Sequence, residues 1–350
     1  MSVSFVATDD LLTPSVYFSA AYGHALEVRD VSRIQQWVKV SSSNGEFQLP
    51  LMLTELGNGQ FEAQSPYGYS GMYLGSGNSP EVHRDAWRSA RELLLDFGVV
   101  SIFLRHAPFE PRSVEIARTF EGIEHTVVSS TIAIDTVKKD DVWNAMRGRA
   151  RTAVRKALNA GMTAEVIPAR REDLVAGSNF RRLYESTMQR LEADRQHYYS
   201  DAYYSMLLRG LGEGLQLATV YSSAGEAVAA SLVMVDKSGV HYHLSGSNPV
   251  ATRDGANNLL VWSILEWSAN AGHSLVHLGG GTSRLDSLYK FKASFGGEDL
   301  PFTVGRVIVN SSAYSRLVQQ RALELGVAAT DLKTSRFFPE YRATVASNGH

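Results

Sequence analysis

The chain contains no cysteine among its 350 residues. Disulfides, zinc–thiolate sites and cysteine nucleophiles are therefore excluded, as is typical of proteins from reducing compartments. No apolar run is long enough to span a membrane, and the N-terminal MSVSFVATDDLL lacks the basic and apolar segments of a signal peptide. We therefore expect a cytoplasmic protein. The formal net charge is only -2, so any contact with nucleic acid must be local.

Several catalytic signatures are also missing from the sequence. It has no GxSxG, no P-loop and no GxGxxG, which leaves a nucleophile-elbow hydrolase, a P-loop phosphotransferase and a Rossmann dehydrogenase without support. His241 and His243 alternate on one face of the predicted strand VHYHL, but no third ligand follows at a suitable spacing. We expect no metal centre.

One order of predicted elements occurs twice along the chain: a hairpin, a glycine-bearing loop, a helix and a strand. The matching landmarks are Gly45 with Gly225, Gly71 with Gly246, and Gly98 with Gly272, at offsets of 174 to 180 residues. Such a repeat indicates one supersecondary unit used in tandem, although a mixed α/β chain can also repeat such patterns by chance. We predict an α/β fold with mixed sheets, divided near the charged KKDD at 138–141.

A basic helix is predicted over 141–161, the segment DVWNAMRGRARTAVRKALNAG. Arg147, Arg151 and Arg155 recur at intervals of four residues along it. Like charges at that spacing repel by roughly 0.2–0.5 kcal/mol per pair, so the arginines do not serve helix stability. A phosphate-bearing partner would neutralise them. The alternative is a solvated face that acidic residues balance elsewhere in the fold.

Lysine is scarce, since only eight of the 34 basic residues are lysines, yet two occur in YKFKASFGG at 289–297. As a helix, this segment places Lys292 on an apolar arc with Leu285, Leu288, Phe291 and Phe295, while Lys290 falls outside it. Ser283 or Asp286 could cap its start, and Gly296-Gly297 would end it. A lysine on an apolar face must snorkel, pair with an anion or lose its proton. The preceding LGGG, with Gly279 and Gly280, could offer backbone N–H groups to a ligand.

The chain resembles the FemABX-like peptidyltransferases of the wider GNAT acyltransferase superfamily. The resemblance follows the order of PYGYSG (66–71), VRKALNAG (154–161), TMQR (187–190), LSGSNPVATRDGANNLLVWSILEWSANAG (244–272), HLGGG and LYKFKASFGG. The most specific piece is the Phe-Lys pair followed by Phe-Gly, here Phe291-Lys292 and Phe295-Gly296. Two features depart from the family pattern. A long charged coiled-coil arm is missing, and HLGGG lacks the acidic residue that often precedes the glycines.

The resemblance implies two GNAT-like domains, one over 1–138 completed by about 306–350, and one over 139–305 that carries the donor site. It also implies transfer of an amino acid from aminoacyl-tRNA to an amine, either on a peptidoglycan precursor or on a small natural product, without a cofactor or a covalent enzyme intermediate. The expected site residues, some implied by the resemblance and others inferred from the sequence, fall into three groups. They are Lys292, Phe291 and Asp286 near the reacting ester; Arg147, Arg151, Arg155, Arg190, Arg253, Gly279 and Gly280 for the donor; and Tyr67 and Tyr69 for the acceptor.

An acyl-CoA-dependent N-acyltransferase on the same fold is the main alternative. Such enzymes carry an R/Q-x-x-G-x-G/A loop between a strand and a helix. The run from Arg209 to Gly214 matches it in letters, but it follows a predicted helix and precedes a strand. Such a loop is expected after the predicted strand VHYHL. The segment ATRDGANN found there keeps only Gly255 and Ala256 of the pattern, which favours tRNA over CoA as the donor carrier. A non-catalytic GNAT-like binding protein is the third possibility.

Overall fold

The computed structural model describes residues 2–6, 13–30, 34–281, 286–334 and 337–344, and the chain divides into two compact units. Unit 1 comprises Met1–Leu12, Ile34–Val127 and Thr303–His350. Unit 2 comprises Thr13–Arg33 and Val128–Phe302. Two long strands, β7 (Glu124–Asp135) and β13 (Glu298–Ile308), carry the chain between the units.

The sheet of unit 1 follows the order β1-β2-β3-β4-β6-β13. Its other strands are β1 (Val3–Val6), β2 (Gln36–Ser42), β3 (Phe47–Gly57), β4 (Gln60–Gln64) and β6 (Val99–Arg105), with the short β5 (Tyr73–Leu74) paired to β3. The hairpin predicted at Asn44-Gly45 joins β2 to β3, and Gly45 adopts the positive φ of 72° that such turns favour. The sequence interpretation missed β4, which pairs in parallel with β6.

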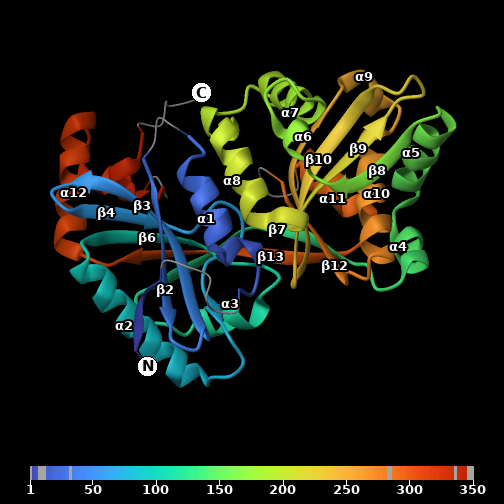
Figure 1. Cartoon of the computed structure of the whole chain (residues 1–350). Helices are drawn as coiled ribbons and strands as arrows, with labels where there is room; N and C mark the ends of the chain where they lie inside the picture. Colours follow the sequence, from blue (N-terminus) through green and yellow to red (C-terminus); the bar gives the residue numbers. More distant parts are fainter. Residues whose placement is uncertain (1, 7–12, 31–33, 282–285, 335–336, 345–350) are drawn as a thin grey trace. The chain divides into compact units, whose positions relative to one another are not determined.

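Helices cover both faces of the unit 1 sheet. On one face, α2 (Pro80–Asp96) and α3 (Pro111–Ala117) pack against apolar side chains of β3 and β6. On the other face lies α12 (Ser311–Leu325), at the end of the chain (Figure 1). With α13 (Ala329–Thr334) and the turn η5 (Glu340–Arg342), it forms a second, smaller core around Val100. The C-terminal segment thus belongs to the core of unit 1.

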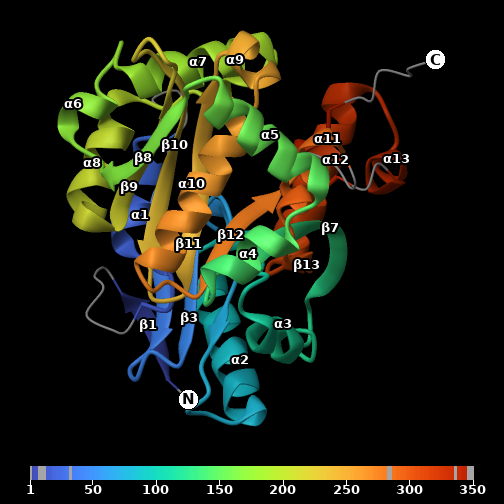
Figure 2. The ribbon, with the colours of Figure 1, turned by 90° about the vertical axis from the view of Figure 1, so that its right-hand side faces the viewer.

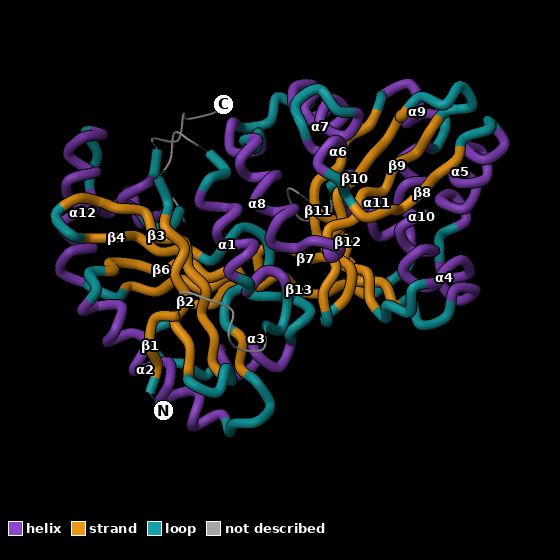
Figure 3. Tube along the Cα trace, viewed as in Figure 1, coloured by secondary structure: helices purple, strands orange, loops and turns teal. Residues whose placement is uncertain are grey.

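The sheet of unit 2 follows the order β7-β12-β11-β10-β9-β8 (Figure 3). Its strands beyond β7 are β8 (Thr163–Pro168), β9 (Leu215–Tyr221), β10 (Ala227–Asp236), β11 (Gly239–Ser247) and β12 (Leu275–Gly280). All neighbours are antiparallel except β11 and β12, which run parallel. The crossover between these two strands passes through α10 (Ala256–Asn270), because parallel neighbours need a long connection.

Helices also cover both faces of the unit 2 sheet (Figure 2). One face carries α4 (Lys139–Ala145), α5 (Gly148–Asn159) and α10 (Ala256–Asn270), whose apolar residues form the larger core. The other face carries α1 (Ala20–Glu27), α7 (Asn179–Arg190) and α8 (Asp201–Leu211). The remaining short elements are η1 (Val16–Phe18), α6 (Arg171–Leu174), η2 (Arg195–His197), η3 (Gly212–Gly214), α9 (Pro249–Arg253), α11 (Ser287–Lys292) and η4 (Ala293–Phe295).

The single helix predicted over 141–161 is wrong, because the chain breaks it into α4 and α5. Met146 has an extended backbone with ψ of 141°, and Arg147 is the extended N-cap of α5. The break is fixed by tertiary structure, since the Arg147 N–H donates to the Ser294 carbonyl at 2.9 Å. Local sequence favours a continuous helix here, and a long-range hydrogen bond overrides it.

Both units contain the same order of elements, which confirms the predicted α/β class and the tandem arrangement. In unit 1 the order is the β2–β3 hairpin, β4, α2 and β6, with β4 and β6 parallel. In unit 2 it is the β9–β10 hairpin, β11, α10 and β12, with β11 and β12 parallel. None of the described helices is long and apolar enough to cross a membrane.

Candidate active site

The two parallel strands of unit 2 separate toward their carboxyl ends. The register joins β11 and β12 only at Val240 with Val276 and at His241 with His277. Beyond these pairs β11 continues to Ser247 and β12 continues to Gly280. Backbone groups between the separating strands are thereby released from the ladder. Ligands of α/β units commonly bind at the carboxyl ends of such strands.

The segment YKFKASFGG forms a helical turn beside this opening, as predicted. Asp286 caps α11 by accepting the Tyr289 N–H at 2.7 Å. The turn η4 follows, and Gly296, with φ of 84°, ends the segment. The predicted apolar arc is only partly right, since Leu288 is 42% exposed while Lys292 is only 8% exposed. Ser283 and Leu285 lie outside the described residues.

Lys292 reaches into the opening between the strands. Its Nζ donates a hydrogen bond to the Gly280 carbonyl at 2.7 Å and lies 5.8 Å from the centroid of the Tyr242 ring. Burial lowers the pKa of Lys292 to about 8, and the negative charge of Asp286 opposes that shift. Lys292 therefore holds a positive charge near neutral pH but gives it up far more readily than an exposed lysine.

The glycines of LGGG are required by close backbone contacts. Gly279 adopts φ of 71° at a bulge where the pairing of β12 with β7 shifts. A side chain on Gly280 would place its Cβ 2.7 Å from the Ser130 carbonyl oxygen. Phe291 is half-buried and packs edge-to-face on Phe295 at 5.3 Å. These residues thus shape the backbone around Lys292.

Three histidines lie behind the opening, each with a structural partner. His277 shares a 3.0 Å hydrogen bond with the Thr131 hydroxyl. His241 lies 3.1 Å from Asp236, and His243 lies 2.7 Å from the Tyr203 hydroxyl. Within the part of the chain that the structure describes, no group of three or more possible metal ligands comes together. His241 and His243 thus serve the packing of β11 against neighbouring elements.

Helix α5 and its N-cap carry arginines that have no acidic partner among the residues that the structure describes. None of Arg147, Arg149, Arg151 and Arg155 forms an ion pair with a carboxylate of the described residues. Arg151 donates to the carbonyls of Trp143 and Asn144, and Arg155 lies 5.3 Å above the Trp143 ring. Arg147, Arg149 and Arg155 are exposed. These three guanidinium groups are available to an anion.

The start of α10 is a second feature suited to an anion. Its N-cap is Gly255, with φ of 92°, and no side chain caps it. A Cβ on Gly255 would lie 2.2 Å from the Ala153 carbonyl oxygen, so only glycine permits this approach of α10 to α5. Lys156 of α5 pairs with Asp254 at 2.9 Å and donates to the carbonyl of the exposed Arg253. Uncapped N–H groups and the helix dipole favour a phosphate at such a position.

The run Arg209–Gly214 is not a phosphate loop. Its residues end α8, form η3 and lead directly into β9. The order is helix, turn and strand, the reverse of the strand-to-helix order that presents helix N–H groups to a ligand. The predicted position of this run, after a helix and before a strand, is confirmed.

The remaining predicted residues are Arg190, Tyr67 and Tyr69. Arg190 is exposed at the end of α7, next to Thr187, whose hydroxyl accepts the Ser247 N–H at 3.0 Å. This bond fixes the end of α7 at the end of β11. Tyr67, 40% exposed, and the half-buried Tyr69 belong to unit 1.

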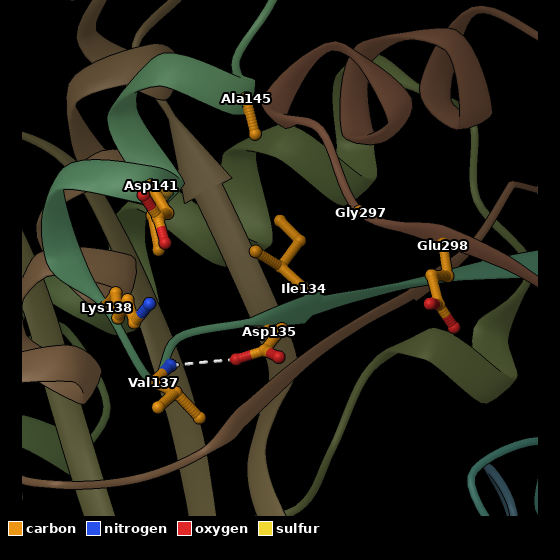
Figure 4. A pocket seen from close by; sticks show the side chains of 9 residues that line it. Ile134, Asp135, Val137, Lys138, Asp141, Ala145, Gly297 and Glu298 are labelled. Carbon is orange, nitrogen blue, oxygen red and sulfur yellow. Dashed lines mark hydrogen bonds between the residues drawn. The ribbon is translucent and has the colours of Figure 1, made fainter.

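A pocket of about 390 Å³ lies past the other end of the Lys292 segment (Figure 4). Figure 4 shows Asp141 and Ile134 among its lining residues, with Glu298 on the strand that follows Gly297. Asp135 accepts the Val137 N–H at 2.8 Å. Three carboxylates and one lysine line it, so its charge does not suit a phosphate. Lys292 is not among its lining residues, and this pocket is not the donor site that we infer.

Comparison with known proteins fits this geometry. The acetyltransferase (GNAT) domain family matches residues 144–292, a stretch that runs from the end of α4 to Lys292 itself. The solved structure of FemX superposes with a TM-score of 0.68 at 14% identity, covering 86% of this chain and 94% of that chain. The chain has a FemABX-like tandem GNAT fold. This confirms the resemblance at the level of fold.

Two further solved structures are similar to this fold. L-PGS from Bacillus licheniformis has a TM-score of 0.53 at 15% identity, with 80% of this chain and 86% of that chain covered. A tandem GNAT protein from the clavulanic acid biosynthesis pathway has a TM-score of 0.52 at 13% identity, with 88% and 99% covered. Among curated proteins no sequence relative matches. The comparisons thus show a GNAT fold, and identities this low say nothing of the substrate.

Proposed function

We propose that the protein transfers the aminoacyl group of an aminoacyl-tRNA to an amine acceptor, with the donor held in unit 2. The observation that carries the proposal is the buried Lys292 ammonium at the opening between β11 and β12, bonded to the Gly280 carbonyl. The ester of an aminoacyl-tRNA is already activated. The chain therefore needs only to position an amine and stabilise the tetrahedral oxyanion, and Lys292 supplies the cation for that.

The arginines of α5 support tRNA as the carrier of the acyl group. Arg147, Arg149 and Arg155 are exposed and have no carboxylate partner among the described residues, so phosphates would neutralise them. A chain of net charge -2 that concentrates unpaired arginines on one short helix provides a local site for a polyanion. The acceptor is a peptidoglycan precursor or a small natural-product amine, and we assign its binding to Tyr67 and Tyr69. The reaction takes place in the bacterial cytoplasm and needs no cofactor.

An acyl-CoA donor is the second candidate, and the start of α10 favours it. Gly255 and the uncapped first turn of α10 stand where a helix N-terminus could receive a diphosphate. The neighbour from clavulanic acid biosynthesis is described in a form without acetyl-CoA. The same helix start can equally receive a phosphate of RNA. A single diphosphate would not need the exposed arginines of α5, so these arginines favour tRNA as the donor.

The test is a donor-dependence assay with the purified full chain. The donor is either pooled tRNA charged with labelled amino acids or labelled acetyl-CoA. The acceptor mixture contains a muramyl pentapeptide precursor and simple amines. We expect label transfer from charged tRNA that RNase abolishes. Transfer from the CoA thioester alone would replace the proposal with the CoA alternative, and no transfer from either donor would support a binding protein.

A further inference from the structure

We propose that Lys292 is itself an acyl acceptor: in the absence of an acceptor amine, its Nζ takes the acyl group of the bound activated donor and the site becomes inactive. This inference rests on the proposed function, because it needs an activated acyl donor at the opening between β11 and β12. It assigns a modification site to the residue that otherwise stabilises the reaction.

The position of Nζ supports this role. The Gly280 carbonyl accepts one of its N–H bonds at 2.7 Å and orients the amine. Nζ also lies over the Tyr242 ring, at 5.8 Å from its centroid, between strands whose pairing ends at His241 and His277. An oxyanion that Nζ stabilises must lie within hydrogen-bond distance of that atom, and the acyl carbon is bonded directly to the oxyanion. The same proximity makes Nζ a competing nucleophile.

The surroundings of Nζ make its neutral form more accessible than that of an exposed lysine. Burial lowers the pKa of Lys292 to about 8, against the effect of Asp286 at the start of α11. From β12, His277 is buried, and burial together with the charges of His241 and Lys292 lowers its pKa well below the usual range, so it stays neutral. From β11, Tyr242 presents an uncharged ring. Asp286 is thus the only opposing charge that acts on Lys292 among the described residues.

The reaction balances without any additional reagent. The neutral amine of Lys292 attacks the acyl carbon, an N–C bond forms, and the bond from that carbon to the leaving oxygen breaks. The proton lost by the amine ends on the leaving oxygen, giving an alcohol and an Nε-acyl-lysine. The amide is far less reactive than the ester, so the product is not an intermediate that passes the group on. It removes the positive charge from the site and stops turnover.

The test uses wild-type full-length protein and a small activated ester, p-nitrophenyl acetate, without tRNA or acceptor. Peptide mass spectrometry measures the rate of acetylation at Lys292 and, as the internal control, at the exposed Lys290. We expect Lys292 to be acetylated at least about tenfold faster than Lys290 at pH 7.5, since an exposed lysine is almost wholly protonated there. The Lys292 rate should rise with pH around a midpoint near 8.

Matched variants complete the experiment. Lys290→Arg should leave the modification of Lys292 unchanged, and Lys292→Arg should abolish the fast acetylation while Lys290 still reacts slowly. Acetylation of Lys290 at a rate equal to or above that of Lys292 would overturn the proposal. Failure of tRNA-dependent transfer, by contrast, would overturn the proposed function and leave the measured acetylation of Lys292 unaffected. Failure of the proposed function can therefore be distinguished from failure of this inference.

Discussion

Lys292 meets two opposed requirements at neutral pH. Stabilising an oxyanion needs the ammonium form, whereas burial favours the neutral amine and lowers the pKa of Lys292 to about 8. The hydrogen bond to Gly280 and the charge of Asp286 keep enough of the cation present. The residue therefore works close to its pKa.

Removing the amine of Lys292 should abolish transfer and spare the fold. We expect Lys292→Met to lower kcat by about 10²–10³, the usual cost of losing one oxyanion donor, while Lys290→Met stays near wild type. The kcat of the wild type should also fall as pH rises through about 8, because the cation is lost there. Steady-state assays across pH measure both effects, and wild-type activity in Lys292→Met would remove this residue from the mechanism.

Stability should change with pH in the opposite direction. The folded pKa of Lys292, about 8, lies below the ordinary value of 10.5, so between these pH values the unfolded chain binds more protons than the folded one. The free energy of unfolding of the wild type therefore gains from this group as pH rises from 8 to 10.5. Lys292→Met should lack that gain and be at least as stable as wild type at pH 7. Urea unfolding at the two pH values measures the difference.

Asp286 can be tested separately as a cap and as a charge. Asp286→Asn keeps a good N-cap for Tyr289 but removes the charge that raises the pKa of Lys292. The alkaline loss of kcat should then begin at lower pH, with little change in melting temperature. Asp286→Ala should also lose about 1 kcal/mol of unfolding free energy. Complete loss of turnover in Asp286→Asn at every pH would instead make this carboxylate the general base.

At the scale of elements, the end of β11 depends on contact with α7. A Cβ on Gly246 would lie 2.3 Å from the Leu183 carbonyl oxygen, so the backbones meet without room for a side chain. Gly246→Ala should lower the unfolding free energy by about 1–3 kcal/mol through overpacking. Gly148→Ala in α5 is the control, because its Cβ would meet nothing within 4 Å. Equal stability of the two variants in urea unfolding would contradict the contact.

The arginines of α5 should govern donor binding and not the chemical step. The triple change Arg147→Gln, Arg149→Gln and Arg155→Gln should raise the donor KM by about tenfold or more at low salt and flatten its salt dependence. Arg151 is left intact, because it donates to two carbonyls at the end of α4. The exposed Arg209 and Arg316, changed together to Gln, provide the control. An unchanged salt dependence in the triple variant would rule out a phosphate surface here.

At the scale of the whole molecule, local patterns predicted most elements but not their long-range contacts. The hairpin at Gly45, the strand VHYHL and the capped turn before Lys292 follow from turn residues, alternation and capping signals. The strand β4 was missed, because its five residues, QFEAQ, carry little apolar alternation. The break at Met146 was also missed, since it depends on the Ser294 carbonyl far along the chain.

The candidate site was predictable only in part, because local patterns do not predict its long-range contacts. The sequence placed Lys292 on a buried face and marked the glycines before it. The pairing of β11 with β12, and the Gly280 carbonyl that receives Nζ, come only from the folded sheet. Leu288 was assigned to the buried face and proves exposed, because helical periodicity over a turn of six residues does not fix which side faces the core.

The central claim is that the activated acyl group lies between β11 and β12, beside Lys292. The most direct measurement is a crystal structure of the protein with a stable analogue of the donor end, an adenosine whose 3′ position carries an amide-linked amino acid. The account predicts the analogue's carbonyl oxygen within hydrogen-bond distance of Lys292 Nζ. An analogue bound elsewhere, with Nζ still bonded only to Gly280, would contradict it.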